Sequence, residues 1–248
     1  MMFIQGLWGD ERFRRYVKVR GDVERAASRP LRPAPVTVLC YGLDNLAFLR
    51  GLGFQAICIH PEPVQNYSGH DVDRDHRQDY TGSIAYGISS WRHKLEVILS
   101  AVEEFKEVVW LDWDCTLELP LPGDFWKELR RQQPLQMGLR WYRRPQCGWR
   151  ESDQKLLPHG AWIYCCDPQI IRDVIAIHST LADGLCMDEH AFAMWFDQQL
   201  GGWKGIEAYR SAGYAPRYYA PPTLPYFPEE AVFCERLPGV ARDKVFKR

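Results

Sequence analysis

The sequence has almost no net charge, no long hydrophobic run and no leader segment that we recognise. Lys and Arg total 31 against 32 Asp and Glu, a formal net charge of −1, so no global basic field indicates nucleic acid or anionic membrane as a partner. No apolar run approaches the roughly 20 residues that a helix needs to cross a bilayer, so we expect no transmembrane segment. Residues 1–13 have neither the basic segment nor the small-residue cleavage site of a secretory signal peptide. We therefore expect a cytoplasmic protein.

The eight cysteines are scattered, and none of them forms a C-x-x-C pair. Their spacing argues against a structural zinc site, because such sites usually draw their ligands from closely spaced pairs. Several lie inside apolar runs, namely Cys40, Cys58, Cys165 and Cys166. Cysteines in such runs are typically buried, reduced thiols of a cytosolic protein.

Apolar runs and amphipathic segments alternate along the chain. The expected strands cover residues 1–9, 36–42, 55–60, 106–114, 135–142 and 160–166. The expected helices cover residues 43–53, 88–105, 121–132, 167–178, 187–200 and 205–213. Residues 61–82 are polar and interrupted by proline, so we expect a loop over a site. Strands that alternate with helices predict an α/β fold with a mixed, mostly parallel sheet and helices on both of its faces.

Two of the expected helices carry clear boundary or packing patterns. The apolar residues of helix 88–105 recur at helical spacing and predict its buried face: Leu95, Ile98, Leu99 and Val102. Ser89 or Ser90 is the expected N-cap of this helix. Asp167 is the expected N-cap of helix 167–178, with Pro168 at its first position.

The stretch "VVWLDWDCTL", residues 108–117, is an apolar strand that ends in two acids one residue apart, Asp112 and Asp114. Carboxylate oxygens suit hard cations such as Mg²⁺ and Mn²⁺, and open α/β sheets bind ligands outside the carboxyl ends of their strands. Two chemistries use this pattern. In one, the acids hold a metal on a diphosphate, and in the other, the first Asp is the nucleophile of a phosphatase.

A phosphatase of the haloacid dehalogenase type is the first alternative, with Asp112 as the nucleophile. Thr116 matches its D-x-D-x-T pattern. In such phosphatases the pattern usually lies on the first strand, whereas a complete strand–helix–strand unit precedes it here. The later acidic pair that this fold needs could only be Asp188 and Glu189, and that pair begins an expected helix. The context favours the metal and diphosphate site.

Three stretches, "VTVLCYG", "WRHKLEVILSAVEEFKEVVWLDWD" and "LCMDEHAFAMW", have the order and character of one known family. From about residue 36 to about residue 200, the sequence resembles nucleotide-sugar glycosyltransferases of the GT-A type. The resemblance implies a single Rossmann-like domain over residues 1–248, with a nucleotide-binding half (1–115) and an acceptor-side half (116–248) that ends in an aromatic, proline-rich tail. The implied activity is metal-dependent transfer of a sugar from a nucleotide-diphosphate donor, with UDP favoured, to a hydroxyl acceptor.

The resemblance also implies roles for individual residues. Asp114 would bind Mn²⁺ or Mg²⁺, and Asp112 would bind the metal or the ribose. The other donor-binding candidates are a basic residue at a helix start, three aromatic residues near the ends of elements and a glycine beside the sugar: Lys94, Trp8, Tyr41, Trp91 and Gly160. Asp188 and Glu189 are the candidates for acceptor chemistry, since an inverting transferase needs a carboxylate to take the hydroxyl proton.

Several of these positions have plainer explanations, which stay open. Asp188 and Glu189 are acids in the first turn of an expected helix, where the helix dipole favours them. Trp91 would also pack at the start of its helix, and Trp113, between the two acids, is expected to pack. His190 is a third metal ligand or a core histidine. His159 is a further candidate for contact with the sugar.

The acceptor is expected to be a glycan rather than a nucleic acid. A nucleic-acid acceptor would require residues 140–150, "RWYRRPQCGWR", to form a basic groove with stacking aromatic residues. A non-catalytic nucleotide-sugar binding module stays open as a second alternative. A nucleotidyltransferase is less well supported, because no glycine-rich loop follows the first strand.

Overall fold

The structure is a computed structural model that describes most of the expected elements. It describes residues 1–9, 14, 36–63, 80–113, 115–117, 121–142, 155–180, 188–201, 206–214, 219–220 and 233–235. Asp114, residues 64–79 of the expected loop and the basic stretch after residue 142 lie outside the described residues, whereas residues 80–82 of that expected loop belong to a helix.

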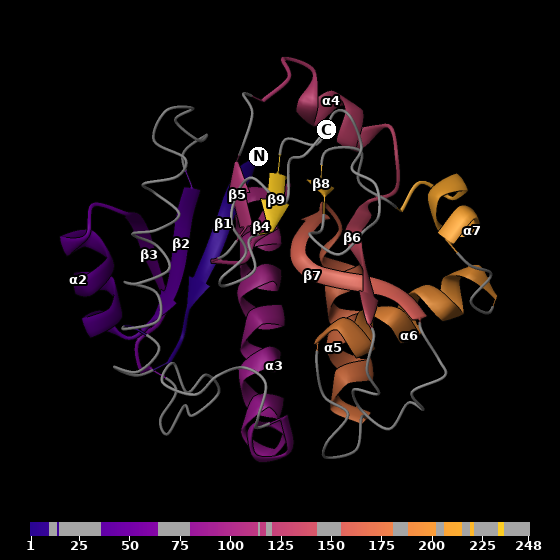
Figure 1. Ribbon diagram of the computed structural model, residues 1–248. Coiled ribbons are helices and arrows are strands. Elements are labelled where there is room, and N and C mark those ends of the chain that lie inside the picture. Colours follow the sequence, from indigo (N-terminus) through magenta and orange to yellow (C-terminus); the bar gives the residue numbers. More distant parts are fainter. Residues whose placement is uncertain are drawn as a thin grey trace, which may run out of the picture.

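The main sheet has six strands in the order β3-β2-β1-β4-β7-β6 (Figure 1). In chain order they are β1 (Met2–Leu7), β2 (Val36–Tyr41), β3 (Gln55–His60), β4 (Val108–Leu111), β6 (Leu135–Tyr142) and β7 (Lys155–Cys165). β3, β2, β1 and β4 run parallel, and β7 is antiparallel to both β4 and β6. The predicted α/β fold with a mixed, mostly parallel sheet is confirmed, and its order is compatible with a Rossmann-like fold.

The central strand β4 is buried on both of its faces. Successive side chains of a strand point to opposite sides, so Val108 and Trp110 pack into the larger hydrophobic cluster, whereas Val109 and Leu111 pack into a smaller one. Strands covered on both faces read as continuous apolar runs, which is why "VVWL" shows no polar alternation.

Helices supply the other side of each cluster. The helices are α2 (Leu43–Gly51), α3 (Tyr80–Phe105), α4 (Phe125–Arg130), α5 (Pro168–Thr180), α6 (Asp188–Leu200) and α7 (Ile206–Ser211). Residues of α2, α3, α5, α6 and α7 belong to the larger cluster, and α4 contributes to the smaller one through Phe125 and Leu129. Figure 1 shows α3 running alongside the middle of the sheet, with α2 beside β3. The sheet is therefore covered on both faces, as expected.

Helix α3 begins eight residues earlier than the sequence analysis predicted, at Tyr80 rather than at residue 88. Ser89 and Ser90 therefore lie inside the helix, and the prediction that one of them caps it was wrong. Serine is common at N-caps but is also tolerated in helices, whereas the apolar spacing of Ile84 and Ile88 continues the helical stripe that leads to Leu95.

The strand boundaries differ at two further places. β4 ends at Leu111, and Cys115–Leu117 forms a separate strand, β5, which pairs with β9 (Phe233–Glu235). β9 also pairs with β8 (Tyr219–Ala220), so a small three-stranded sheet follows the acidic pair. β7 begins at Lys155, five residues before the predicted strand, because its first part pairs with β6 alone. Such pairing is long-range and leaves little trace in local sequence.

Several local predictions are confirmed. Asp167 Oδ1 accepts the backbone N–H of Gln169 at 2.9 Å, as an N-cap does, and Pro168 opens α5. Of the four cysteines predicted to be buried, Cys40 and Cys165 are buried, whereas Cys58 and Cys166 are only partly buried, and all four are free thiols. Burial raises the pKa of the Cys40 thiol to about 12. None of the described helices is long and apolar enough to cross a membrane.

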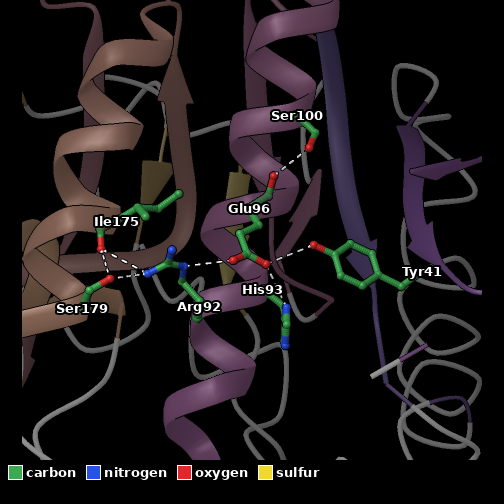
Figure 2. Close-up of polar contacts among 7 residues, drawn as sticks. All are labelled: Tyr41, Arg92, His93, Glu96, Ser100, Ile175 and Ser179. Atoms are coloured by element: carbon green, nitrogen blue, oxygen red, sulfur yellow. Dashed lines mark hydrogen bonds and ion pairs between the residues drawn. The ribbon is translucent and has the colours of Figure 1, made fainter. Parts of the chain in front are cut away.

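A polar network crosses the outer side of α3 and is centred on Glu96 (Figure 2). The Glu96 carboxylate accepts hydrogen bonds from the Tyr41 hydroxyl at 3.2 Å and from Arg92 Nε at 3.0 Å, and lies 3.0 Å from His93 Nδ1. The hydrogen bond with His93 and the neighbouring Arg92 hold the pKa of Glu96 below its usual range, although burial opposes them. Arg92 also donates to the carbonyl of Ile175 on α5 at 3.3 Å. The network thus joins β2 and α5 to one helix.

We expect Ile98→Ala to destabilise the fold by about 2–5 kcal/mol, because Ile98 is fully buried and its loss leaves a cavity between α3 and the sheet. Leu99→Ala is the matched control, since Leu99 is on the same helix and only partly buried. Denaturant unfolding should give a clearly smaller loss for Leu99→Ala. Equal losses would contradict the described orientation of α3.

Candidate functional site

Asp112 follows β4 directly and lies on the side of the sheet that faces α3. Side chains two residues apart on an extended chain share a face, so Asp112 lies on the same side as Trp110. The indole Nε1 of Trp110 donates to Asp112 Oδ1 at 2.6 Å. The backbone N–H of Asp112 donates to the carbonyl of Ala161 at 2.9 Å, which ties the residue to β7. The first acid of the pair is thereby held at the carboxyl end of a parallel strand.

Lys94 reaches this acid from α3. Its side chain is only 2% exposed, and its ammonium lies 3.1 Å from Asp112 Oδ1 and 3.0 Å from Asp188 Oδ2. It donates to the carbonyl of Gly160 at 2.8 Å and lies 5.4 Å from the centre of the Trp110 ring. Burial alone would lower the pKa of Lys94, but the charges of Asp112 and Asp188 outweigh it and raise this pKa. The amine is therefore charged at neutral pH.

Gly160 brings the cluster together through its backbone. The pairing of β6 with β7 shifts abruptly, from Met137 opposite Ile163 to Gly138 opposite His159, so residues 160–162 fall between these partners. The released carbonyl of Gly160 binds Lys94, and its N–H donates to Glu189 Oε1 at 3.1 Å. A Cβ at this position would lie 2.6 Å from Lys94 Nζ and 2.7 Å from Asp188 Oδ2. A glycine is needed at position 160 because the side chains of Lys94 and Asp188 leave no room for a Cβ.

Asp188 and Glu189 begin helix α6 and are both buried. Burial raises the pKa of Asp188 to about 6, with Lys94 opposing that shift and the negative charges of Glu189 and Asp112 adding to it. Glu189 Oε1 lies 2.5 Å from His159 Nδ1, in addition to accepting the N–H of Gly160. The two neighbouring acids thus have different partners.

The described part of the cluster carries three carboxylates and one ammonium, those of Asp112, Asp188, Glu189 and Lys94. Such a group favours an added cation or ligand groups that donate hydrogen bonds, such as sugar hydroxyls. The side chain of Asp112 is 29% exposed, whereas that of Asp188 is 1% exposed. The accessible side of the cluster is therefore the side of Asp112.

The residues fit a divalent cation only as part of a larger ligand set. Carboxylate oxygen is the right donor for Mg²⁺ or Mn²⁺, and Asp112 is partly exposed. Its Oδ1 already accepts from Trp110 and contacts Lys94. No group of three or more His, Cys, Asp or Glu residues within the described ranges could hold a metal ion. Mg²⁺ often takes one or two carboxylates and completes its shell with phosphate oxygens and water, so Asp112 could supply one of these carboxylates.

The structure brings together five of the candidates from the sequence: Lys94, Asp112, Gly160, Asp188 and Glu189. They come from α3, the end of β4, β7 and the start of α6, and all meet on the α3 side of the sheet at the end of β4. Asp114 lies outside the described residues, as does the side chain of Trp91.

Of the aromatic candidates, Trp8 packs beside the cluster, and Tyr41 belongs to the Glu96 network. Trp8 is buried in the larger cluster, with its ring centre 6.4 Å from that of Trp110. Tyr41 is bound to Glu96 and has its ring centre 5.1 Å from that of His60. Trp113 donates from Nε1 to the carbonyl of Gly6 at 2.9 Å and is 5% exposed, which confirms that it packs. Contact of Trp8 or Tyr41 with a nucleotide base stays a prediction.

Two residues that contact the charged cluster, Trp110 and His159, were not predicted from the sequence to do so. Trp110 was considered only as a strand residue, although its spacing of two from Asp112 places both on one face. His159 was considered for contact with a sugar, and its pairing with Glu189 was not foreseen. The sequence holds no local pattern for that contact, because the two residues are 30 positions apart.

We expect Lys94→Met to destabilise the fold by about 3–5 kcal/mol at pH 7.5, because it leaves buried carboxylates without their counter-ion. The loss should be smaller at pH 5. The pKa of Asp188 in the folded protein is about 6, above its unfolded value, so its contribution to stability is present at low pH and is lost as the pH rises through about 6. At pH 5 the Asp188 carboxyl is mostly protonated and therefore has less need of the Lys94 counter-ion. Denaturant unfolding at both pH values measures this. Lys127→Met, an exposed change on α4, should stay within about 0.5 kcal/mol, and a pH-independent loss for Lys94→Met would contradict the described cluster.

We expect Gly160→Ala to cost about 1–3 kcal/mol, because the new methyl group would press on both Lys94 and Asp188. Gly51→Ala is the control, since a Cβ there meets nothing within 4 Å and alanine favours the helix. Thermal and denaturant unfolding should show Gly51→Ala to be neutral or slightly stabilising. A Gly160→Ala variant as stable as the wild type would be incompatible with the close approach.

Comparison with known proteins adds no assignment. No protein-family model matches the chain, and no curated protein matches it in sequence. A functional interpretation therefore depends on the residues of the cluster and on their position in the sheet.

Proposed function

We propose that the chain is a metal-dependent glycosyltransferase of the GT-A type that moves a sugar from a nucleotide-diphosphate donor to a hydroxyl acceptor. One observation carries the proposal. Lys94, Asp112 and the acids of α6 converge on Gly160 at the carboxyl end of parallel strand β4. In open α/β sheets, ligands bind outside the carboxyl ends of the strands.

Asp112 and Asp114 are the proposed ligands of Mn²⁺ or Mg²⁺ on the donor diphosphate. The bound cation would neutralise the charge that develops on the leaving group. Asp112 suits this position because its carboxylate is partly exposed while Trp110 and β7 fix its orientation. UDP remains the favoured donor nucleotide, on the resemblance alone.

Asp188 and Glu189 are the proposed residues of the sugar and acceptor side. In the transfer, the acceptor oxygen forms a bond to the anomeric carbon as the bond from that carbon to the diphosphate oxygen breaks, and the diphosphate leaves with the electron pair. The acceptor proton passes to a carboxylate of the enzyme in an inverting reaction. Lys94 keeps Asp188 in place, and its charge limits repulsion among the acids.

The test is calorimetric titration of UDP and GDP, each with and without Mn²⁺. We expect binding of at least one nucleotide to require Mn²⁺ and to weaken at least about tenfold, or about 1.4 kcal/mol, in Asp112→Asn and in Asp114→Ala. Asp197→Asn is the matched control, because Asp197 is an exposed acid in the last part of α6 and its substitution should leave binding unchanged.

Failure of the wild type to bind either nucleotide with Mn²⁺ would contradict the transferase proposal. The phosphatase alternative makes a different prediction, since beryllofluoride should then form an adduct that is lost in Asp112→Asn. A binding module without catalysis would bind the nucleotide sugar and never release its sugar.

A further inference from the structure

The two acids at the start of α6 differ in accessibility. The side chain of Asp188 is 1% exposed and is paired with Lys94, which also contacts Asp112. The side chain of Glu189 is 10% exposed and is bound by residues of β7 instead. Asp188 thus belongs to the closed ion cluster, and Glu189 has the larger accessible part. Of the two, Glu189 is better placed to meet a substrate.

His159 and Gly160 hold one oxygen of Glu189 from two directions. Oε1 lies 2.5 Å from His159 Nδ1 and accepts the backbone N–H of Gly160 at 3.1 Å. When Glu189 is ionised, its oxygen can only accept, so the hydrogen lies on His159 Nδ1. Two donors on a single oxygen restrict rotation of the carboxylate. The contacts of Oε1 therefore restrict the orientation of Oε2.

His159 is itself firmly placed. Its side chain is 5% exposed, and its backbone pairs with Gly138 at the point where the register of β6 and β7 shifts. The register shift directs the side chain of His159 and the N–H of Gly160 to the same carboxylate. A simple continuation of the ladder would instead have used that N–H within the sheet. The Gly160 N–H freed by the register shift and the His159 side chain therefore both contact Glu189 Oε1.

We propose that Glu189 is the carboxylate that takes the acceptor proton and that His159 is a positioning residue that fixes the orientation of that carboxylate. This inference rests on the proposed function, because it assigns roles within the same site. His159 acts through Glu189 and need not touch the substrate. A positioned base lowers the barrier to transfer because the entropy cost of bringing the reacting atoms to the right distance and angle has already been met.

A purely structural pair that joins α6 to β7 is the competing explanation, and the choice of substitutions separates the two. His159→Asn keeps a donor near the place of Nδ1, whereas His159→Leu keeps bulk and removes the donor. His178→Leu is the matched control, since His178 is also buried but lies on α5, which contributes none of the cluster residues named above. A purely structural role would show itself as a loss of unfolding free energy in His159→Leu with no change in the kcat of the folded protein.

The first measurement is the ¹H–¹⁵N NMR spectrum of imidazole-labelled protein without any ligand. We expect a far-downfield Nδ1–H resonance from His159, because a short hydrogen bond to a carboxylate deshields the proton. It should be lost in His159→Asn and in Glu189→Met, and kept in His178→Leu. Absence of the resonance, or its persistence in Glu189→Met, would overturn the pairing on which the inference stands.

The second measurement is UDP release from UDP-glucose in the presence of Mn²⁺, with water as the acceptor. We expect His159→Leu to lower kcat about 10- to 100-fold, the range typical of residues that orient a functional group, with little change in KM. His159→Asn should recover a large part of kcat, and His178→Leu should keep it. Unchanged kcat in His159→Leu, or equal kcat losses in His159→Leu and His159→Asn, would overturn the positioning role.

The two measurements fail in distinguishable ways. If the wild type binds neither UDP nor GDP with Mn²⁺ and releases no nucleoside diphosphate from UDP-glucose or GDP-glucose, the proposed function is contradicted, and the positioning role falls with it. The resonance would still decide whether His159 and Glu189 form the described pair. If the wild type is active and the resonance is absent, the function stands and the role of His159 is excluded.

Discussion

The contact on which the rest of the site depends is the buried ammonium of Lys94. An unpaired charge in the interior would cost several kcal/mol, so a buried lysine must be surrounded by acceptors. Asp112, Asp188 and the carbonyl of Gly160 meet this need from three separate elements. The end of β4, the start of α6 and the register shift in β7 are therefore linked through one side chain.

Helix α3 is held on two sides. Lys94 fixes its inner side to the carboxylates, and Glu96, two residues later, gathers Tyr41 and Arg92 on its outer side. Arg92 extends the outer network to Ile175 of α5, so the helix is tied both to the first strands and to the later helices (Figure 2). A residue that orients reacting groups needs such support, because small displacements weaken electrostatic and proton-transfer contacts.

Much of the main sheet could be predicted from the sequence, because its strands are continuous apolar runs and its helices show apolar spacing. The position of Asp112 at the end of β4 was also foreseen, since this acid follows the apolar run directly. The start of α3 was not, because two serines resemble a cap. The register shift at Gly160 was not foreseen, since it depends on how the consecutive strands β6 and β7 pair, which local sequence does not reveal. The contact of His159 with Glu189 follows from that shift and was equally invisible.

The charge balance of the cluster is the strongest physical reason to regard it as functional. A structural ion cluster of this kind gives little net stability, and its replacement by apolar residues is often neutral or stabilising by about 1–4 kcal/mol. Among the described residues, the carboxylates of Asp112, Asp188 and Glu189 gather around the single ammonium of Lys94, and burial already raises the pKa of Asp188. A site built only for stability would avoid such crowding of like charges. A site that receives a cation and hydroxyl groups beside Asp112 would have a use for it, because both interact favourably with clustered carboxylates.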